Sequence, residues 1–199
     1  MEIRPYHSNY QKGWLQCRVL AFLETAYYDN VLREKETYDH KAIELVAIQQ
    51  DKIVGLIDVE YESEKNTVCT GENGLGGMIW HLAVHPDYQR LGIGHQLLNR
   101  AERMASEKGI NYLEAWTRDD EWVLNWYQKN GFHPVHSYLH VFLEGKSETS
   151  YLKSEVGNFY PVQAWAHYTG KDEQVIRQAF RRIHTCTGLE KRLNHAGNL

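Results

Sequence analysis

The hydrophobic period of the chain changes sharply at a short glycine-containing loop near its middle. Residues 78–84 form a short continuous apolar run, which is typical of a buried strand. From Gly94 onward the apolar residues recur at the spacing of a helix, at Leu97, Leu98, Ala101, Met104 and Ala105. A strand that passes through a loop directly into an amphipathic helix is a building unit of α/β folds. This junction therefore constrains the fold more than any other segment.

The flanking segments predict further elements of the same fold class. Expected strands are residues 2–4, 42–49, 53–61, 78–84, 111–117 and 135–143, and the second and third form a hairpin around Asp51-Lys52. Expected helices are residues 10–32, 94–109 and a third that begins at Asp119 or Asp120 and ends at Gly131. The order hairpin, strand, helix, strand, helix, strand predicts an α/β fold with a mixed sheet.

Composition limits the class of protein. A chain of 199 residues that is 42% hydrophobic and 24% charged is expected to form one domain, or one domain with an elaboration. It has no apolar run of about 18 residues, so we expect no transmembrane helix, and its first residues lack a secretory signal. A net charge of −4 does not favour nucleic-acid binding.

Cysteine and histidine spacing gives no metal site. Three cysteines, odd in number and far apart, lack zinc-site spacing, which indicates a reduced cytoplasmic home. His81 and His85 are four residues apart, as are His136 and His140, and in an extended chain that separation is about 13 Å. Such pairs are too far apart to share an ion, so we expect no metal.

The loop between the central strand and helix has the features of an anion site. It delivers the chain to a helix N-terminus, where unpaired N–H groups and the helix dipole favour negative charge. Gly92 and Gly94 allow close approach of the backbone, and Arg90 adds positive charge. A phosphate or pyrophosphate would fit. The alternative is a purely structural turn, since Leu97 breaks the GxGxxG pattern and no P-loop lysine follows.

Two motifs give a specific resemblance. The segment Leu82-Ala83-Val84-His85-Pro86-Asp87-Tyr88-Gln89-Arg90-Leu91-Gly92-Ile93-Gly94 resembles motif A of the GNAT superfamily of N-acetyltransferases, with its core at Gln89, Gly92 and Gly94. Further on, Trp126-Tyr127-Gln128-Lys129-Asn130-Gly131-Phe132 resembles motif B. The resemblance implies a mixed, mostly antiparallel central sheet flanked by helices, with two parallel strands splayed at an acyl-CoA site.

The resemblance also implies how acetyl-CoA, as co-substrate, would be held. The backbone of Leu82, Ala83 and Val84 would bind the pantetheine arm, and the Val84 N–H would polarise the thioester carbonyl. Asp120 stands where the family often has an asparagine that contacts CoA, although a helix N-cap is the alternative role. Backbone N–H groups after the motif glutamine would hold the pyrophosphate, namely those of Arg90, Leu91, Gly92, Ile93, Gly94 and His95.

The implied reaction is direct attack of a neutral amine on the acetyl thioester. Tyr127 matches the family's general acid, which protonates the leaving thiolate, and the alternative is a buried core tyrosine. Glu114 resembles the general base if the following loop is one residue longer here, and otherwise Ala115 takes that position. His81, Glu60 and a water chain remain open as alternatives for the base.

The acceptor is expected from the variable parts of the chain. Tyr27, Tyr28, Asp29, Tyr38 and Tyr61 lie where the family's acceptor cleft is usually walled, and this mixture would suit a cationic amine of a small molecule or a protein. The alternative is that these rings only pack the helices against the sheet.

The likeness covers about three quarters of the chain. We expect an acetyltransferase core at residues 1–145 and a C-terminal helical extension at residues 146–199, with a helix near residues 172–183. The extension would pack on the core or at a homodimer interface. A catalytically silent acyl-CoA-binding regulatory or interaction module is the alternative function.

Overall fold

The computed structural model describes residues 1–193, which are built around one mixed eight-stranded sheet. The strand order is β1-β2-β3-β4-β5-β8-β6-β7, and only β4 and β5 run parallel. The predicted fold class, a mostly antiparallel mixed sheet with flanking helices, is confirmed. The strands are β1 (Glu2–Pro5), β2 (Ala42–Gln49), β3 (Lys52–Tyr61), β4 (Gly76–Val84), β5 (Tyr112–Thr117), β6 (His133–Glu144), β7 (Gln163–Tyr168) and β8 (Arg182–Arg192).

Five α-helices accompany the described strands. The helices are α1 (Gln11–Phe22), α2 (Ile93–Glu107), α3 (Glu121–Lys129), α4 (Gly145–Thr149) and α5 (Glu173–Ala179), and short 3₁₀ turns occupy Ser8–Tyr10 and Pro86–Tyr88. Helix α1 ends at Phe22 rather than near residue 32, because the chain continues in turns from there. None of the helices in residues 1–193 has the length and apolar character needed to cross a bilayer.

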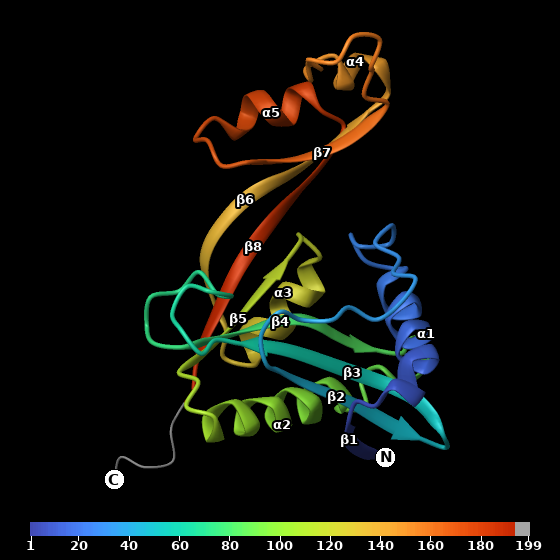
Figure 1. Ribbon diagram of the computed structural model, residues 1–199, viewed down its shortest axis with the longest axis vertical. Helices are drawn as coiled ribbons and strands as arrows, with labels where there is room; N and C mark the ends of the chain where they lie inside the picture. The colour runs from blue at the N-terminus through green and yellow to red at the C-terminus, as the bar shows by residue number, and fades with distance from the viewer. Residues whose placement is uncertain (194–199) are drawn as a thin grey trace.

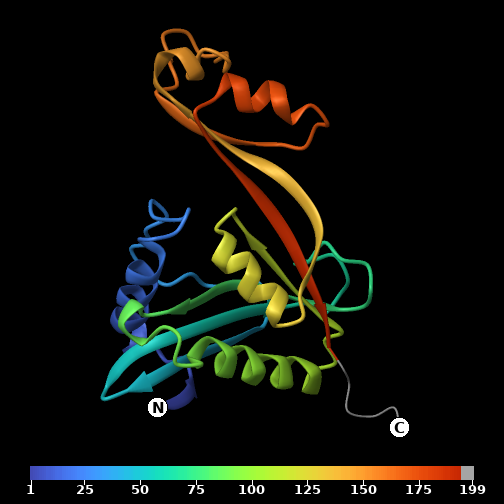
Figure 2. The same cartoon turned by 180° about the vertical axis from the view of Figure 1, so that it is seen from behind.

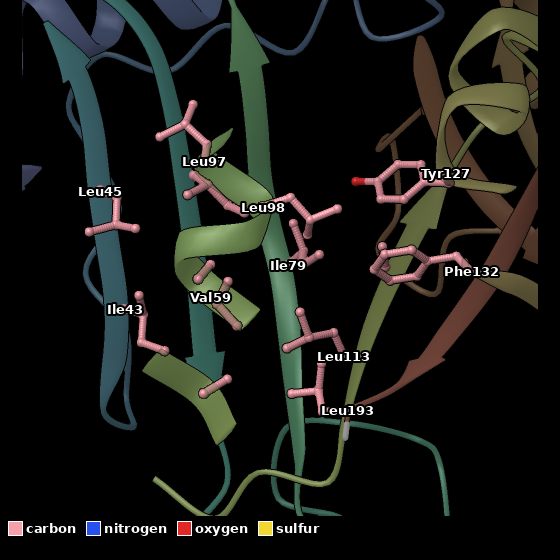
Figure 3. Close-up of a cluster of buried hydrophobic side chains, with 14 of the residues drawn as sticks. Ile43, Leu45, Val59, Ile79, Leu97, Leu98, Leu113, Tyr127, Phe132 and Leu193 are labelled. Carbon is pink, nitrogen blue, oxygen red and sulfur yellow. The ribbon is translucent and has the colours of Figure 1, made fainter. Parts of the chain in front are cut away.

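Alternation along β2 and β3 divides the core between the two faces of the sheet. On one face, Leu97 and Leu98 of α2 are fully buried against residues such as Leu45 and Ile79, as Figure 3 shows. On the other face, Trp14 of α1 is fully buried in a second cluster with residues of β2, β3 and β4. The period-2 pattern of the strands and the helical stripe of α2 therefore place their apolar residues as the sequence predicts.

Strands β6 and β8 form a long twisted ribbon that leaves the core, and β7, α4 and α5 lie at its far end (Figures 1 and 2). We call residues 138–186 the arm. One face of the arm is covered, because Leu139, Val141 and Leu143 pack with Ile176 and Phe180 from the region of α5. The ribbon thus has its own small apolar core.

The last fifty residues differ from the expected helical extension. Of the helix expected near residues 172–183, only residues 173–179 are helical, and strand β8 follows them. Strand β8 lies between β5 and β6, with Ala115 opposite Leu189 and Tyr138 opposite Cys186. Strand β8, at residues 182–192, is therefore an integral part of the sheet, which does not end at residue 145. The pattern is hidden in the sequence because charged residues flank the few buried positions of β8.

Candidate functional site

A gap opens between β4 and β5 because the two parallel strands pair over only part of their length. Their register runs from Gly76 opposite Tyr112 to Ile79 opposite Ala115 and then stops. Directly after Ile79, the register between β4 and β3 also shifts: His81 lies opposite Asp58 and Ile79 opposite Val59, so Trp80 has no partner residue on β3 and forms a bulge. Such a bulge bends the strand away from its neighbour. The gap forms part of a cleft of about 1480 Å³ that also reaches α1, α3 and the arm.

The predicted anion loop lines one end of this cleft. Arg90 (φ 60°) and Gly92 (φ 78°) are both left-handed, and α2 begins directly afterwards at Ile93. The first N–H groups of α2 have no intrahelical acceptor and are free for a ligand. The Gln89 side chain donates to the Val84 carbonyl oxygen at 3.3 Å, which ties the loop to the end of β4. Cleft-lining residues of this segment are Gln89, Arg90, Gly92, Ile93, Gly94 and His95, whereas the Leu91 side chain is exposed.

The edge of β4 that faces the gap offers backbone groups. The His85 N–H donates to the Val54 carbonyl oxygen at 3.0 Å, on the β3 side. Because successive N–H groups on a strand point to opposite sides, the N–H of Val84 is directed toward the gap. The predicted pantetheine-binding residues Leu82, Ala83 and Val84 all line the cleft.

Tyr127 lies on α3 and closes the cleft from the other side. Its ring is buried at 8% exposure and packs edge to face with Phe132 at 5.1 Å between centroids. In Figure 3 its hydroxyl points away from α3 and toward β4. Burial, and secondarily Tyr27, raises the pKa of the Tyr127 phenol, which further favours its protonated form.

Glu114 is buried and fully engaged. Its carboxylate accepts hydrogen bonds from Thr70 N–H (2.8 Å), the Thr70 hydroxyl (2.9 Å), Gly71 N–H (3.2 Å) and Trp116 Nε1–H (2.6 Å). It is not among the described residues that line the cleft. The structure thus shows Glu114 fixing the loop at residues 62–75 against β5.

Asp120 occupies the N-cap position of α3, but its carboxylate makes no capping bond. It accepts instead from the Ala26 N–H, at 2.9 and 3.1 Å, and so fastens the segment after α1 to the start of α3. Its side chain lines the cleft. The expected capping bond is therefore absent, the CoA contact stays a prediction, and the bond to Ala26 is one that the sequence did not suggest.

A family comparison agrees with this geometry. The family model described as an acetyltransferase (GNAT) domain matches residues 40–134, which run from β2 through the anion loop and α3 to the start of β6. The segment that carries the anion loop and Tyr127 thus belongs to the GNAT acetyltransferase family.

Individual relatives are distant or cover only part of the chain. A ycf52-like uncharacterized N-acetyltransferase of Prochlorococcus marinus is 34% identical over 64 residues, which are 32% of this chain and 34% of that protein. The tRNA(Met) cytidine acetyltransferase TmcA of Aeropyrum pernix is 31% identical over 135 residues, covering 59% of this chain and 19% of that protein. This chain therefore spans about a third or less of the length of these curated relatives.

A solved structure shows the same fold over nearly the whole chain. The GNAT family acetyltransferase of Elizabethkingia anophelis, determined with acetyl-CoA bound, covers 96% of this chain and 97% of its own. The TM-score is 0.52 and the sequence identity 18%, so the likeness is one of fold.

The expected acceptor residues separate into two groups in the structure. Tyr27 and Asp29 line the cleft, and Asp29 pairs with Arg182 at 2.7 Å. Tyr38 instead donates to Asp58 Oδ2 at 2.9 Å beside a smaller cavity, while Tyr61 packs at the edge of the α2-side core. Tyr28 is half exposed and is not among the described residues that line the cleft.

A carboxylate that the sequence did not single out stands at the bulge. Glu36 Oε2 lies 2.5 Å from His81 Nε2, and Arg18 Nε–H donates to His81 Nδ1 at 3.3 Å. Because Nδ1 accepts this bond, the ring proton of His81 is on Nε2, and Nε2–H donates a hydrogen bond to Glu36. All three residues line the cleft, whereas Glu60 accepts from Trp80 and His40 beside the smaller cavity. The bond from His81 lowers the pKa of Glu36.

Proposed function

We propose that this chain is an acetyl-CoA-dependent N-acetyltransferase that transfers an acetyl group to a primary amine. The observation that carries the proposal is the meeting, in one cleft, of an anion loop, an unpaired strand edge and the Tyr127 hydroxyl. The acetyl-CoA in the Elizabethkingia anophelis structure supports the choice of co-substrate. The names of the relatives, which include N-acetyltransferases, support the reaction class.

The residues of the cleft fit acetyl-CoA. N–H groups at the start of α2, together with Arg90, suit the pyrophosphate. The exposed edge of β4 at residues 82–84 suits the amides of pantetheine, which would bind as an added strand. This arrangement directs the thioester toward the end of the gap between β4 and β5.

The chemistry then follows from the groups around that gap. The neutral amine nitrogen attacks the thioester carbonyl carbon, a C–N bond forms and the C–S bond breaks. The Val84 N–H stabilises the oxyanion of the tetrahedral intermediate. Tyr127 gives its phenolic proton to the departing thiolate.

Glu36 is the best placed acceptor for the proton that the amine must lose. Its carboxylate is ionised, lines the cleft and is oriented by His81, so it would attract an ammonium group. Glu114, the residue expected from the sequence, has its acceptor capacity taken up by four hydrogen bonds. We therefore assign the role of proton acceptor to Glu36.

Replacement of Tyr127 by Phe tests the function. The variant should release CoA thiol at least about 100-fold more slowly across a panel of amines, while its affinity for CoA stays the same. The ring stays in place, so the fold is kept. Undiminished transfer would reject Tyr127 as the acid. A wild-type chain that binds CoA but releases no thiol with any amine would favour the silent acyl-CoA-binding module instead.

A further inference from the structure

One face of the arm, together with Trp116 of the neighbouring strand β5, carries a set of ring side chains in mutual contact. Tyr138 and His167 lie 4.2 Å apart between ring centroids, and Trp116 lies 5.4 Å from Tyr138. His140 and Trp165 are stacked at 5.2 Å with an angle of 16° between their planes. We call this set the ring surface: Trp116, Tyr138, His140, Trp165 and His167.

The ring surface lies on the side of the sheet from which an acceptor would approach. Alternation on β5 places Trp116 on the face opposite to Ala115, which packs in the α2-side core. The anion loop and α2 lie on the face of the sheet to which Ala115 points, opposite to the ring surface. All five rings line the same cleft as Tyr127 and Glu36. A substrate that meets the thioester from the open side therefore passes over the ring surface.

The outer rings of this surface are left exposed. Trp165 is 63% exposed and His167 is also exposed, although the opposite face of the arm is covered from the region of α5. Cross-strand ring pairs stabilise a ribbon. The contacts between the rings are sufficient to stabilise the ribbon. Stabilisation does not explain why the face of the Trp165 indole is open to the cleft.

The surface is aromatic rather than cationic. Burial, followed by the charge of Arg118, lowers the pKa of His140 to about 4, so its imidazole is neutral at neutral pH. Asp29 offsets the two neighbouring guanidiniums, at 2.7 Å from Arg182 and 3.9 Å from Arg118. A neutral ring stacked on an indole favours a flat, polarisable group above it.

We propose that the ring surface binds a planar aromatic group of the acceptor, so that the preferred acceptor is an alkylamine that carries an aromatic ring rather than one without a ring of this kind. This inference rests on the proposed function and specifies its substrate class. The amine would point to Glu36 and the thioester, and the aromatic group would stack on the face of Trp165.

Matched pairs of acceptors test the proposal. The series is ω-phenylalkylamines with two to six methylene groups, each compared with its ω-cyclohexyl counterpart, which has similar size but no flat ring. At the chain length that spans the cleft, kcat/KM of the wild type should be about five-fold higher for the phenyl compound, because its KM is lower. Equal kcat/KM for both members of every pair would overturn the proposal and leave the proposed function intact.

Replacement of Trp165 by Ala should abolish the preference for the phenyl compound, because the KM of the phenyl acceptor should rise to that of its cyclohexyl counterpart. Replacement of Tyr160 by Ala is the matched control, because Tyr160 is an exposed ring of the same arm (79% exposed) outside the described cleft lining. A preference that survives in W165A would overturn the proposal. If no amine were acetylated, the proposed function would fail. Equilibrium binding of the same pairs to the CoA-loaded protein would then decide whether the ring surface exists as a site.

Discussion

At the scale of single residues, Glu36 gives the sharpest prediction. Glu36→Gln keeps the shape of the side chain and removes its charge, so the amine must arrive without its proton. We expect kcat/KM at neutral pH to fall about 100-fold. An alkylamine has a pKa near ~10, so the loss should shrink as the pH of the assay rises toward that value.

Glu34→Gln is the control for this variant, because Glu34 is an exposed carboxylate of the same segment outside the described cleft lining. It should leave the pH profile of kcat/KM unchanged. Full activity of E36Q at pH 7 would contradict the assignment of the proton to Glu36.

The residues of the site were predictable to different degrees. Gly92 and Tyr127 carry motif signals, and the structure places both at the cleft. Glu36 lies in a non-periodic segment, and His81 faces Glu36 only because the bulge at Trp80 shifts the register of β4. No local pattern reports a bulge of this kind, since it depends on how β3 and β4 pair.

At the scale of elements, the loop between β3 and β4 depends on Glu62. Burial alone would raise the pKa of Glu62, but hydrogen bonds from the N–H groups of Gly76, Cys69, Val68 and Thr67 outweigh it and lower the pKa. A lowered folded-state pKa stabilises the protein above the unfolded value, about 4.3, and this contribution is lost as pH falls through the folded value.

We therefore expect Glu62→Gln to lower Tm at pH 7 and to flatten the decline of Tm below about pH 4. Thermal unfolding followed by circular dichroism between pH 2 and 7 measures both effects. Glu64→Gln is the control, since Glu64 is exposed in the same loop. A wild-type Tm that does not decline more steeply than that of E62Q below this pH would refute the role of Glu62.

Most elements were predictable because their periods are local, whereas β8 was not. The stripe of α2 repeats within a few residues, so Leu97 and Leu98 mark it without knowledge of the rest of the fold. The place of β8 depends on pairing with β5 and β6, at positions such as Leu189 that are far from their partners in sequence. The alternation of rings at Tyr138, His140 and Phe142 was visible, but which face of the sheet they share depends on that pairing.

At the scale of the whole molecule, the arm should be separable from the acetyltransferase core. The pairs nearest the core, from Thr117 opposite Thr187 to Tyr112 opposite Arg192, do not involve the far end of the ribbon. We expect a variant in which Asn-Gly replaces residues 141–183 to fold, because this dipeptide favours a tight hairpin turn. Exposure of Leu139, which is fully buried in the native chain, should lower the free energy of unfolding by about 2 kcal/mol.

The shortened variant separates binding of the co-substrate from recognition of the acceptor. It retains the anion loop, Val84 and Tyr127, so its Kd for CoA, measured by calorimetry, should equal that of the wild type. It lacks Trp165 and His167, so its kcat/KM should no longer distinguish phenyl from cyclohexyl acceptors. If CoA binding were lost as well, with the circular dichroism spectrum of a folded chain, the arm would have to contribute to the co-substrate site. An undiminished preference for phenyl acceptors would instead place the aromatic group elsewhere in the cleft.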